Sequence, residues 1–145
     1  MLKLLLMSTL LGIVACTPED DAVTPSSSNV AGIVMSAGGH TFTVTMEQNT
    51  TAEAFCAMLP LTLEMSELNG NEKYHYLDRS LPTNTVHPGT IHAGDIMIYG
   101  DKCVVVFYET FSTSYSYSVI GHTDDIEHLR EALGNSSVTI KFEQQ

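Results

Sequence analysis

The chain has 145 residues, of which 43% are hydrophobic, and its formal net charge at pH 7 is −11. A chain of this size and composition can bury one hydrophobic core, which excludes a protein that is disordered throughout. The basic residues after the N-terminal segment are scattered and form no stripe that could follow a phosphate backbone, which argues against nucleic-acid binding. They are Lys73, Arg79, Lys102, Arg130 and Lys141.

Residues 1–15 have the features of a lipoprotein signal peptide. Lys3 provides a basic start, and residues 4–14 form an apolar segment that is too short for a bilayer span of about 20 residues. The segment Ile13-Val14-Ala15-Cys16 resembles the bacterial lipobox, in which the cysteine becomes the lipidated N-terminus. We therefore expect lipidation at Cys16; an ordinary secretory leader is the alternative.

Residues 16–29 are predicted to be a flexible, lipid-anchored tether, because they are rich in proline, serine and acids and offer little to bury. The run Glu19-Asp20-Asp21 is typical of a solvated linker, and it also resembles the surface-export signals of bacterial lipoproteins. Several acyl chains on one cysteine anchor a protein stably. The sequence thus predicts an exported membrane lipoprotein, at the outer membrane or cell surface rather than the inner membrane.

The predicted domain, residues 30–145, opens with a hairpin. Its second strand alternates strictly, with Phe42, Val44 and Met46 set against three threonines, which indicates one buried and one wet face. Asn49 and its neighbours can cap a helix over residues 52–58, and Pro60 ends it.

The middle of the domain alternates short strands with turns. Residues 61–65 alternate again, a turn at 68–72 follows, and residues 73–77 form the next strand. Residues 78–94 have two prolines, two glycines and little periodicity. A loop of this length is expected to be functional or folded onto the surface.

Residues 94–125 hold the strongest β signal. A turn at residues 100–102 separates an apolar run at 96–99 from one at 103–108, whose unbroken hydrophobicity predicts a strand covered on both faces. A hydroxyl-rich segment with alternating aromatics, residues 110–117, precedes a short strand at 118–121.

The last elements are a helix over residues 126–133, with Asp125 near its cap and Gly134 at its end, and a strand over 138–142. About eight strands and two short helices predict an all-β fold, a closed eight-stranded β-barrel with a helix at each end. A two-sheet sandwich is the alternative.

The polar residues give no catalytic or metal motif. No pair of histidines has compact metal-ligand spacing, so neither a metal nor another cofactor is expected. The serines of residues 111–118 lie in no Gly-x-Ser-x-Gly motif, and the chain has no glycine-rich phosphate loop. Cys56 and Cys103 are expected to be buried free thiols; an exported compartment also permits a disulfide between them.

The aromatic residues are the best indication of a binding site, since tyrosine offers contact area with a polar tip. They cluster in the half of the chain that carries the long loop. The alternative is that these aromatic residues only cover one end of the barrel and bind nothing. The groove candidates are Met65, Tyr74, Tyr76, Phe107, Tyr108, Tyr115 and Tyr117.

Several short segments resemble the small bacterial cyclophilin-like proteins over residues 29–143. They are Leu59-Pro60-Leu61-Thr62-Leu63-Glu64-Met65, Glu72-Lys73-Tyr74, Leu81-Pro82, Gly94-Asp95-Ile96-Met97-Ile98-Tyr99, Val106-Phe107-Tyr108 and Ile120-Gly121. The resemblance implies a cyclophilin-type barrel with two helices and a groove on one wall.

The catalytic pattern of true cyclophilins, which are prolyl isomerases, does not carry over. Their Phe-His-Arg-Val-Ile-type segment has no counterpart, and Arg79 is the nearest arginine to its expected position. Tyr117 stands where a histidine precedes a Phe-Gly pair in the family. We therefore expect a module that binds an extended peptide or small ligand without catalysis; a weak prolyl isomerase is the alternative.

Overall fold

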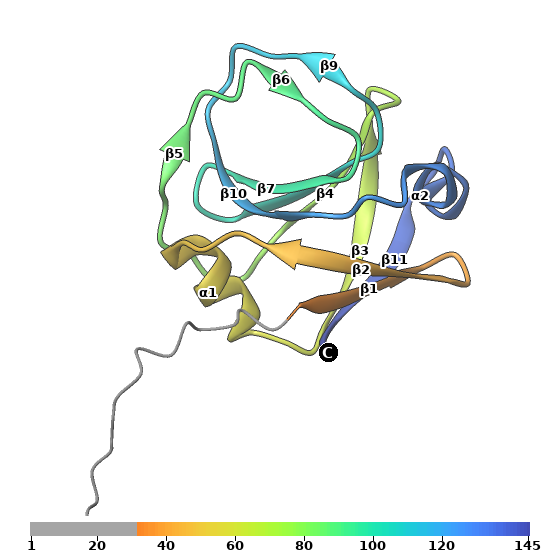
Figure 1. Cartoon of the computed structure of the whole chain (residues 1–145), viewed down its shortest axis with the longest axis horizontal. Helices are drawn as coiled ribbons and strands as arrows, with labels where there is room; N and C mark the ends of the chain where they lie inside the picture. Colours follow the sequence, from red (N-terminus) through yellow and green to blue (C-terminus); the bar gives the residue numbers. More distant parts are fainter. Residues whose placement is uncertain (1–31) are drawn as a thin grey trace, which may run out of the picture.

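The computed structural model describes residues 32–145, so the predicted signal peptide, Cys16 and the tether lie outside the described residues. Figure 1 shows the strands wrapped around a common centre, with the two helices on different sides. The elements are β1 (Ile33–Ala37), β2 (His40–Met46), α1 (Thr50–Cys56), β3 (Leu61–Leu68), β4 (Glu72–Tyr76), β5 (Thr85–Val86), β6 (Thr90–Ile91), β7 (Asp95–Tyr99), β8 (Cys103–Phe107), β9 (Phe111–Ser112), β10 (Tyr117–His122), α2 (Ile126–Leu133) and β11 (Val138–Gln144).

The main sheet closes into an antiparallel barrel. Its strands follow the order β2-β1-β11-β3-β4-β8-β7-β10, and β10 pairs back onto β2. At this closure Gly121 lies opposite Met46. A Cβ on Gly121 would lie 2.4 Å from the Thr45 carbonyl oxygen, so glycine allows the two strands to meet. The predicted eight-stranded barrel is confirmed, and the sandwich alternative is wrong.

Two apolar clusters lie on opposite faces of the barrel wall. The interior cluster includes Phe42, Phe55 and Phe142, and the outer cluster includes Phe107 and Tyr117. Strand β8 serves both, because Val104 and Val106 pack inside while Cys103, Val105 and Phe107 pack outside. All five residues of β8 are buried, as its unbroken apolar sequence predicts.

The long segment 78–94 folds down onto the barrel instead of projecting from it. Its strand β5 pairs with β10, and β6 pairs with β9 of the hydroxyl-rich segment. Ile91 is fully buried in the outer cluster. The segment therefore covers the outer face of β7 and β8, which explains why that face is apolar.

Both helices begin at the side chain that the sequence indicates. Asn49 Oδ1 accepts a hydrogen bond from the Ala52 amide at 2.8 Å, so α1 begins two residues earlier than expected. The bounds of α2 are as predicted, with Asp125 as N-cap and Gly134 as C-cap. Neither of these helices, within the described residues, is long and apolar enough to cross a membrane.

The tip of the first hairpin packs closely on α2. Gly38 has φ of 55°, and a Cβ there would lie 2.5 Å from the Ala132 carbonyl oxygen. Gly39 also has a positive φ, 83°, but a Cβ there would have no neighbour within 4 Å. The two glycines therefore separate the cost of backbone strain from the cost of a lost contact.

We expect Gly38→Ala to destabilise the protein by about 2–4 kcal/mol, because it adds a backbone clash to the left-handed strain. Gly39→Ala carries the strain alone and is expected to cost about 1–2 kcal/mol. Urea unfolding of both variants measures the difference. Equal losses would show that the hairpin tip does not rest on α2.

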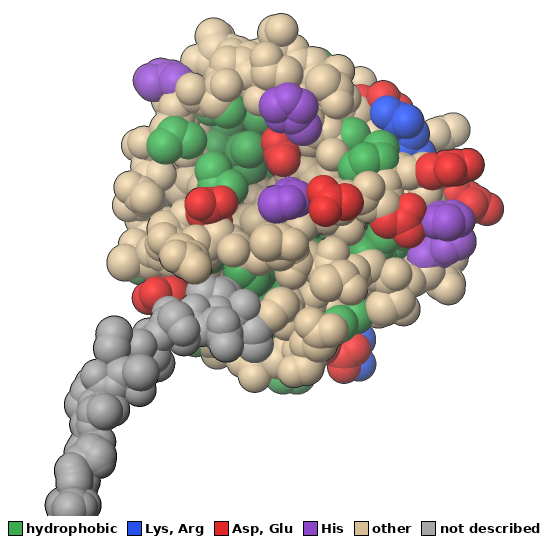
Figure 2. All heavy atoms as spheres, in the orientation of Figure 1, with side chains coloured by type: hydrophobic (Ala, Val, Ile, Leu, Met, Phe, Trp, Pro, Cys, Tyr) green, Lys and Arg blue, Asp and Glu red, His purple; other side chains and the backbone are tan. Residues whose placement is uncertain are grey.

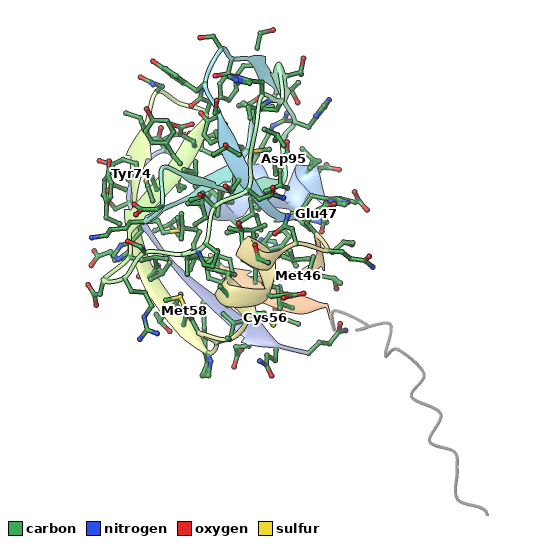
Figure 3. The ribbon with its side chains drawn as sticks, turned by 90° about the vertical axis from the view of Figure 1, so that its left-hand side faces the viewer. Met46, Glu47, Cys56, Met58, Tyr74 and Asp95 are labelled. Atoms are coloured by element: carbon green, nitrogen blue, oxygen red, sulfur yellow. The ribbon has the colours of Figure 1, made fainter. Side chains whose placement is uncertain are left out.

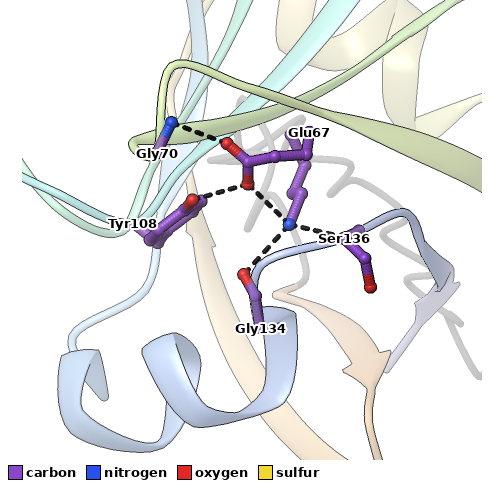
Figure 4. Close-up of polar contacts among 6 residues, drawn as sticks. Glu67, Gly70, Tyr108, Gly134 and Ser136 are labelled. Carbon is purple, nitrogen blue, oxygen red and sulfur yellow. Dashed lines mark hydrogen bonds and ion pairs between the residues drawn. The ribbon is translucent and has the colours of Figure 1, made fainter.

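A buried lysine ties the β3–β4 hairpin to the end of α2 (Figure 4). Lys73 is fully buried, and its Nζ donates to Glu67 Oε1 at 2.7 Å, to the Gly134 carbonyl at 3.1 Å and to the Ser136 carbonyl at 2.7 Å. Tyr108 donates to the same Glu67 oxygen at 2.6 Å. Burial alone would raise the pKa of Glu67, but the hydrogen bonds from Lys73, Tyr108 and the Gly70 amide outweigh it and lower the pKa.

Candidate functional site

An open groove of about 370 Å³ lies on the outer surface of the barrel, over β4, β8 and β7. Its walls also come from the β3–β4 turn and from the segment before β10. Figure 3 shows Tyr74 on this outer side of the barrel, away from Cys56 and Met58 at the end of α1. The residues that line the groove are Leu68, Asn69, Glu72, Tyr74, Tyr76, Tyr99, Cys103, Val105, Tyr115 and Tyr117.

Strand alternation and cross-strand pairing bring these side chains together. Glu72, Tyr74 and Tyr76 occupy every second position of β4 and therefore share a face. Cys103 lies opposite both Tyr76 and Tyr99 in the sheet. A row of side chains thus crosses three strands, with the buried Cys103 between the exposed Tyr76 and Tyr99.

The tyrosine rings of the groove form two contact groups with exposed edges. Tyr99 packs against Tyr115 and Tyr117 with centroid distances of 5.9 and 5.7 Å, and Tyr74 meets Tyr76 edge-on at 6.0 Å. Tyr76, Tyr99 and Tyr115 are 63%, 46% and 60% exposed, whereas Tyr117 is only 5% exposed. Tyr117 is held from below by Phe107, at 5.6 Å. A buried base with exposed aromatic walls suits a ligand that supplies apolar surface.

Glu72 carries the carboxylate of the groove, and the neighbouring ionisable side chains are neutral. Burial raises the pKa of the Cys103 thiol to about 11, and the charge of Glu72 adds to the rise. Burial also raises the pKa of the Tyr117 phenol, and the neighbouring Cys103 raises that of Tyr76. The pKa of Glu72 is raised as well, first by burial and then by the charge of Glu67. The thiol and these two phenols are therefore neutral near pH 7.

We expect Cys103 to resist alkylation, because only the thiolate is an effective nucleophile and the residue is 4% exposed. Iodoacetamide at pH 8 should modify native Cys56, which is half-buried, before Cys103. Mass spectrometry of tryptic peptides would measure the order. Unfolding in urea serves as the control, since both thiols should then react at similar rates. Faster native modification of Cys103 would contradict the expectation.

The sequence pattern of the cyclophilin-like family matches residues 35–143. The chain belongs to the cyclophilin-like family. No match was found among curated proteins.

A solved structure titled "Structure of McbB in complex with tryptophan" shares the fold, with a TM-score of 0.58 and 16% sequence identity. The alignment covers 78% of this chain and 44% of that chain, so this cyclophilin-like domain spans less than half of its neighbour. At this identity the likeness concerns the fold alone.

Four of the residues predicted for the groove line it: Tyr74, Tyr76, Tyr115 and Tyr117. Phe107 is fully buried beneath Tyr117 and supports the groove without lining it. Met65 and Tyr108 require correction, because both belong to the interior cluster of the cyclophilin-like barrel. Met65 shares the inward face of β3 with Leu63, and the Tyr108 hydroxyl donates a hydrogen bond to Glu67.

The prediction missed Glu72 and Tyr99, which lie beside the predicted tyrosines. A signal for Glu72 was present, since period-two alternation from Tyr74 and Tyr76 places it on the same face. Tyr99 joins the groove through the pairing of β7 with β8, which the turn at residues 100–102 already indicated. No local pattern shows that β4 pairs with β8, the pairing that brings Tyr74 and Tyr76 to the same surface. The remaining missed residues are Leu68, Asn69, Cys103 and Val105.

Arg79 lies in a different cavity from the tyrosines. A cleft of about 360 Å³ opens between the end of α1, the start of β3 and the segment after β4. Arg79 lines this cleft together with His75, and no arginine among residues 32–145 lines the tyrosine groove. The nearest arginine to the expected isomerase position is thus separated from the aromatic surface.

The cysteines and histidines are spread over the barrel. Cys56 packs against the interior cluster and Cys103 belongs to the outer one, so the barrel wall separates the two free thiols and no disulfide joins them. Within residues 32–145, no three side chains of His, Cys, Asp or Glu gather closely enough to hold a metal ion. On the face seen in Figure 2, histidine side chains lie beside acidic ones, and basic side chains are few; His128, for example, lies 3.0 Å from Asp125.

Proposed function

We propose that this cyclophilin-like domain binds an extended peptide or a small molecule in the tyrosine groove, without catalysing a reaction. The observation that carries the proposal is the exposure of Tyr76, Tyr99 and Tyr115 around one hollow, over a buried aromatic base. Exposed aromatic surface is unfavourable in water, so a ligand that covers it lowers the free energy.

The structural neighbour supports a small ligand with an aromatic part, because it was solved in complex with tryptophan. Tryptophan derivatives and short proline-containing peptides are therefore the first compounds to test. The absence of arginine from the described lining favours binding over prolyl isomerisation, since the family's isomerases polarise the peptide bond with an arginine.

An NMR titration of the 15N-labelled domain tests the proposal. Compounds and peptides that bind should shift the resonances of Tyr74, Tyr76, Tyr99 and Tyr115 and leave those of β1 unchanged. Tyr76→Ala should weaken binding at least about fivefold, because it removes one exposed wall of the groove. Thr43→Ala, on the wet face of β2, is the matched control. If a broad peptide and small-molecule library leaves every groove resonance in place, the proposal is wrong.

The same titration decides whether the site is catalytic. Peptides with an Xaa-Pro bond show separate cis and trans resonances, and an isomerase exchanges them fast enough to broaden the lines. We expect the lines to stay sharp at stoichiometric protein. Broadening that disappears in Tyr76→Ala would make the protein a prolyl isomerase instead.

We also propose that the domain is an envelope lipoprotein, exported by residues 1–15, anchored through a lipid on Cys16 and spaced from the membrane by residues 16–29. The lipobox-like sequence and the polar composition of the tether support this. The full-length protein should incorporate labelled palmitate and sediment with membranes, whereas Cys16→Ala should do neither. Protease accessibility on intact cells would test the surface location. Labelling that persists in Cys16→Ala would refute the anchor.

A further inference from the structure

We infer that the tyrosine groove selects ligands that carry an organic ammonium group, with the Glu72 carboxylate as the anionic partner of that group. The inference rests on the proposed binding function and specifies the chemistry of its ligand. Its basis is the pairing of one half-buried carboxylate with several tyrosine faces in a hollow that has no basic side chain among its described lining residues.

Glu72 is held in the groove by its place in the sheet. It lies at the start of β4, opposite Phe107 of β8, and on the same face as Tyr74. Among the described lining residues of the groove no Lys, Arg or His lies beside it, and the adjacent Lys73 is paired with Glu67. Glu72 is half-buried and lines the groove, so its carboxylate has lost part of its hydration while its oxygens still reach the solvent in the groove, where a cation could pair with them.

The nearest basic residue in the sequence cannot fill this role. Lys73 points to the other face of β4, where Glu67 and two backbone carbonyls use all three of its donors. Glu67 is therefore matched by Lys73, while Glu72 remains unmatched. Burial and the charge of Glu67 raise the pKa of Glu72, and a bound cation would offset both effects.

The aromatic walls add a second attraction for the same group. A tyrosine ring has a negative face, so an ammonium group gains when it lies over the ring within about 6 Å of its centroid. Tyr74 lies two positions from Glu72 on the same face of β4 and meets Tyr76 edge-on at 81°. Tyr99 lies opposite Tyr76, across Cys103. Because the Cys103 thiol, with its pKa of about 11, stays neutral, Glu72 is the charged group of the described lining.

The net charge of the protein also favours a cationic ligand. A net charge of −11 attracts cations toward the surface and repels anions. A carboxylate ligand would meet Glu72 without any lysine or arginine of the groove to receive it. The ammonium group can belong to a free amine or to a lysine or methyl-lysine side chain of a peptide, and the two sources present the same chemistry to the groove.

Isosteric probes test the inference. Choline and 3,3-dimethylbutan-1-ol have nearly the same shape but differ in charge, so calorimetric or NMR titration of the domain compares charge alone. We expect choline to bind about tenfold more tightly, or better. Blocked tripeptides with a central trimethyl-lysine, or with its neutral analogue that has carbon in place of the ammonium nitrogen, repeat the comparison for the peptide source, and the tighter cation shows which source fits.

Glu72→Gln identifies the group responsible. It should remove the preference for the cation and leave the affinity for the neutral isostere unchanged, which also shows that the groove is intact. Glu64→Gln, an exposed position on β3 outside the groove, is the matched control and should keep the preference. Equal binding of the two isosteres by the native protein would overturn the inference and leave the proposed function standing. Absence of binding by every probe would also overturn it, and the library titration then decides the proposed function separately.

Discussion

Lys73→Ala should destabilise the domain by about 3–5 kcal/mol, the range found when one partner of a buried ion pair is removed. Three acceptors lose their donor at once: Glu67, the Gly134 carbonyl and the Ser136 carbonyl. The carbonyls lie at the exit of α2, 61 and 63 residues away in sequence. The loss therefore unties the β3–β4 hairpin from the C-terminal part of the barrel.

Urea unfolding followed by circular dichroism measures the loss. Lys141→Ala is the matched control, because its 3.0 Å pair with Glu143 is about half exposed and should contribute less than about 1 kcal/mol. Lys73→Met keeps the apolar stem and should fall between the two. A loss below 1 kcal/mol in Lys73→Ala would show that water replaces the ammonium group without cost.

The pH dependence of this cluster follows from Glu67, whose pKa in the folded protein is lowered. A lowered folded pKa means that the carboxylate stabilises the fold above its unfolded pKa, and that this contribution is lost as the pH falls through the folded value. The native domain should therefore lose stability on acidification below the unfolded pKa of Glu67. Glu67→Gln should lose less over the same interval.

Much of the barrel could be predicted because local patterns decide its elements. The alternation of Phe42, Val44 and Met46 places the buried face of β2, and the cap at Asp125 places the start of α2. The uniformly apolar β8 indicated two covered faces before its neighbours were known. Each of these signals is contained within about ten residues of sequence.

The site was harder to predict because it depends on which strands become neighbours. Phe107 and Tyr108 are adjacent in sequence, yet the first supports the groove from outside and the second lies in the barrel interior. Lys73 resembled any scattered surface lysine, since its acceptors at Gly134 and Ser136 follow from the fold alone. The sequence shows which side chains are present, but not which other residues they contact in the fold.

Phe107→Ala should also cost about 3–5 kcal/mol, because a fully buried phenylalanine leaves a large cavity when truncated. Phe107 lies between Phe111, at 5.7 Å, and Tyr117, at 5.6 Å. The cavity would open beneath the base of the groove, so ligand affinity should fall together with stability. Thermal unfolding and the NMR titration measure the two effects on one variant.

Phe111→Ala provides the comparison, since Phe111 is half-buried and shares a ring contact with Phe107. We expect it to cost about 1–2 kcal/mol, and the double variant to lose less than the sum, with a coupling of about 0.5–1.5 kcal/mol. Additive losses would mean that the strand pair β6–β9 covers the barrel without supporting its outer core. A Phe107→Ala variant that loses stability as expected but keeps its ligand affinity would show that the groove does not depend on the outer core.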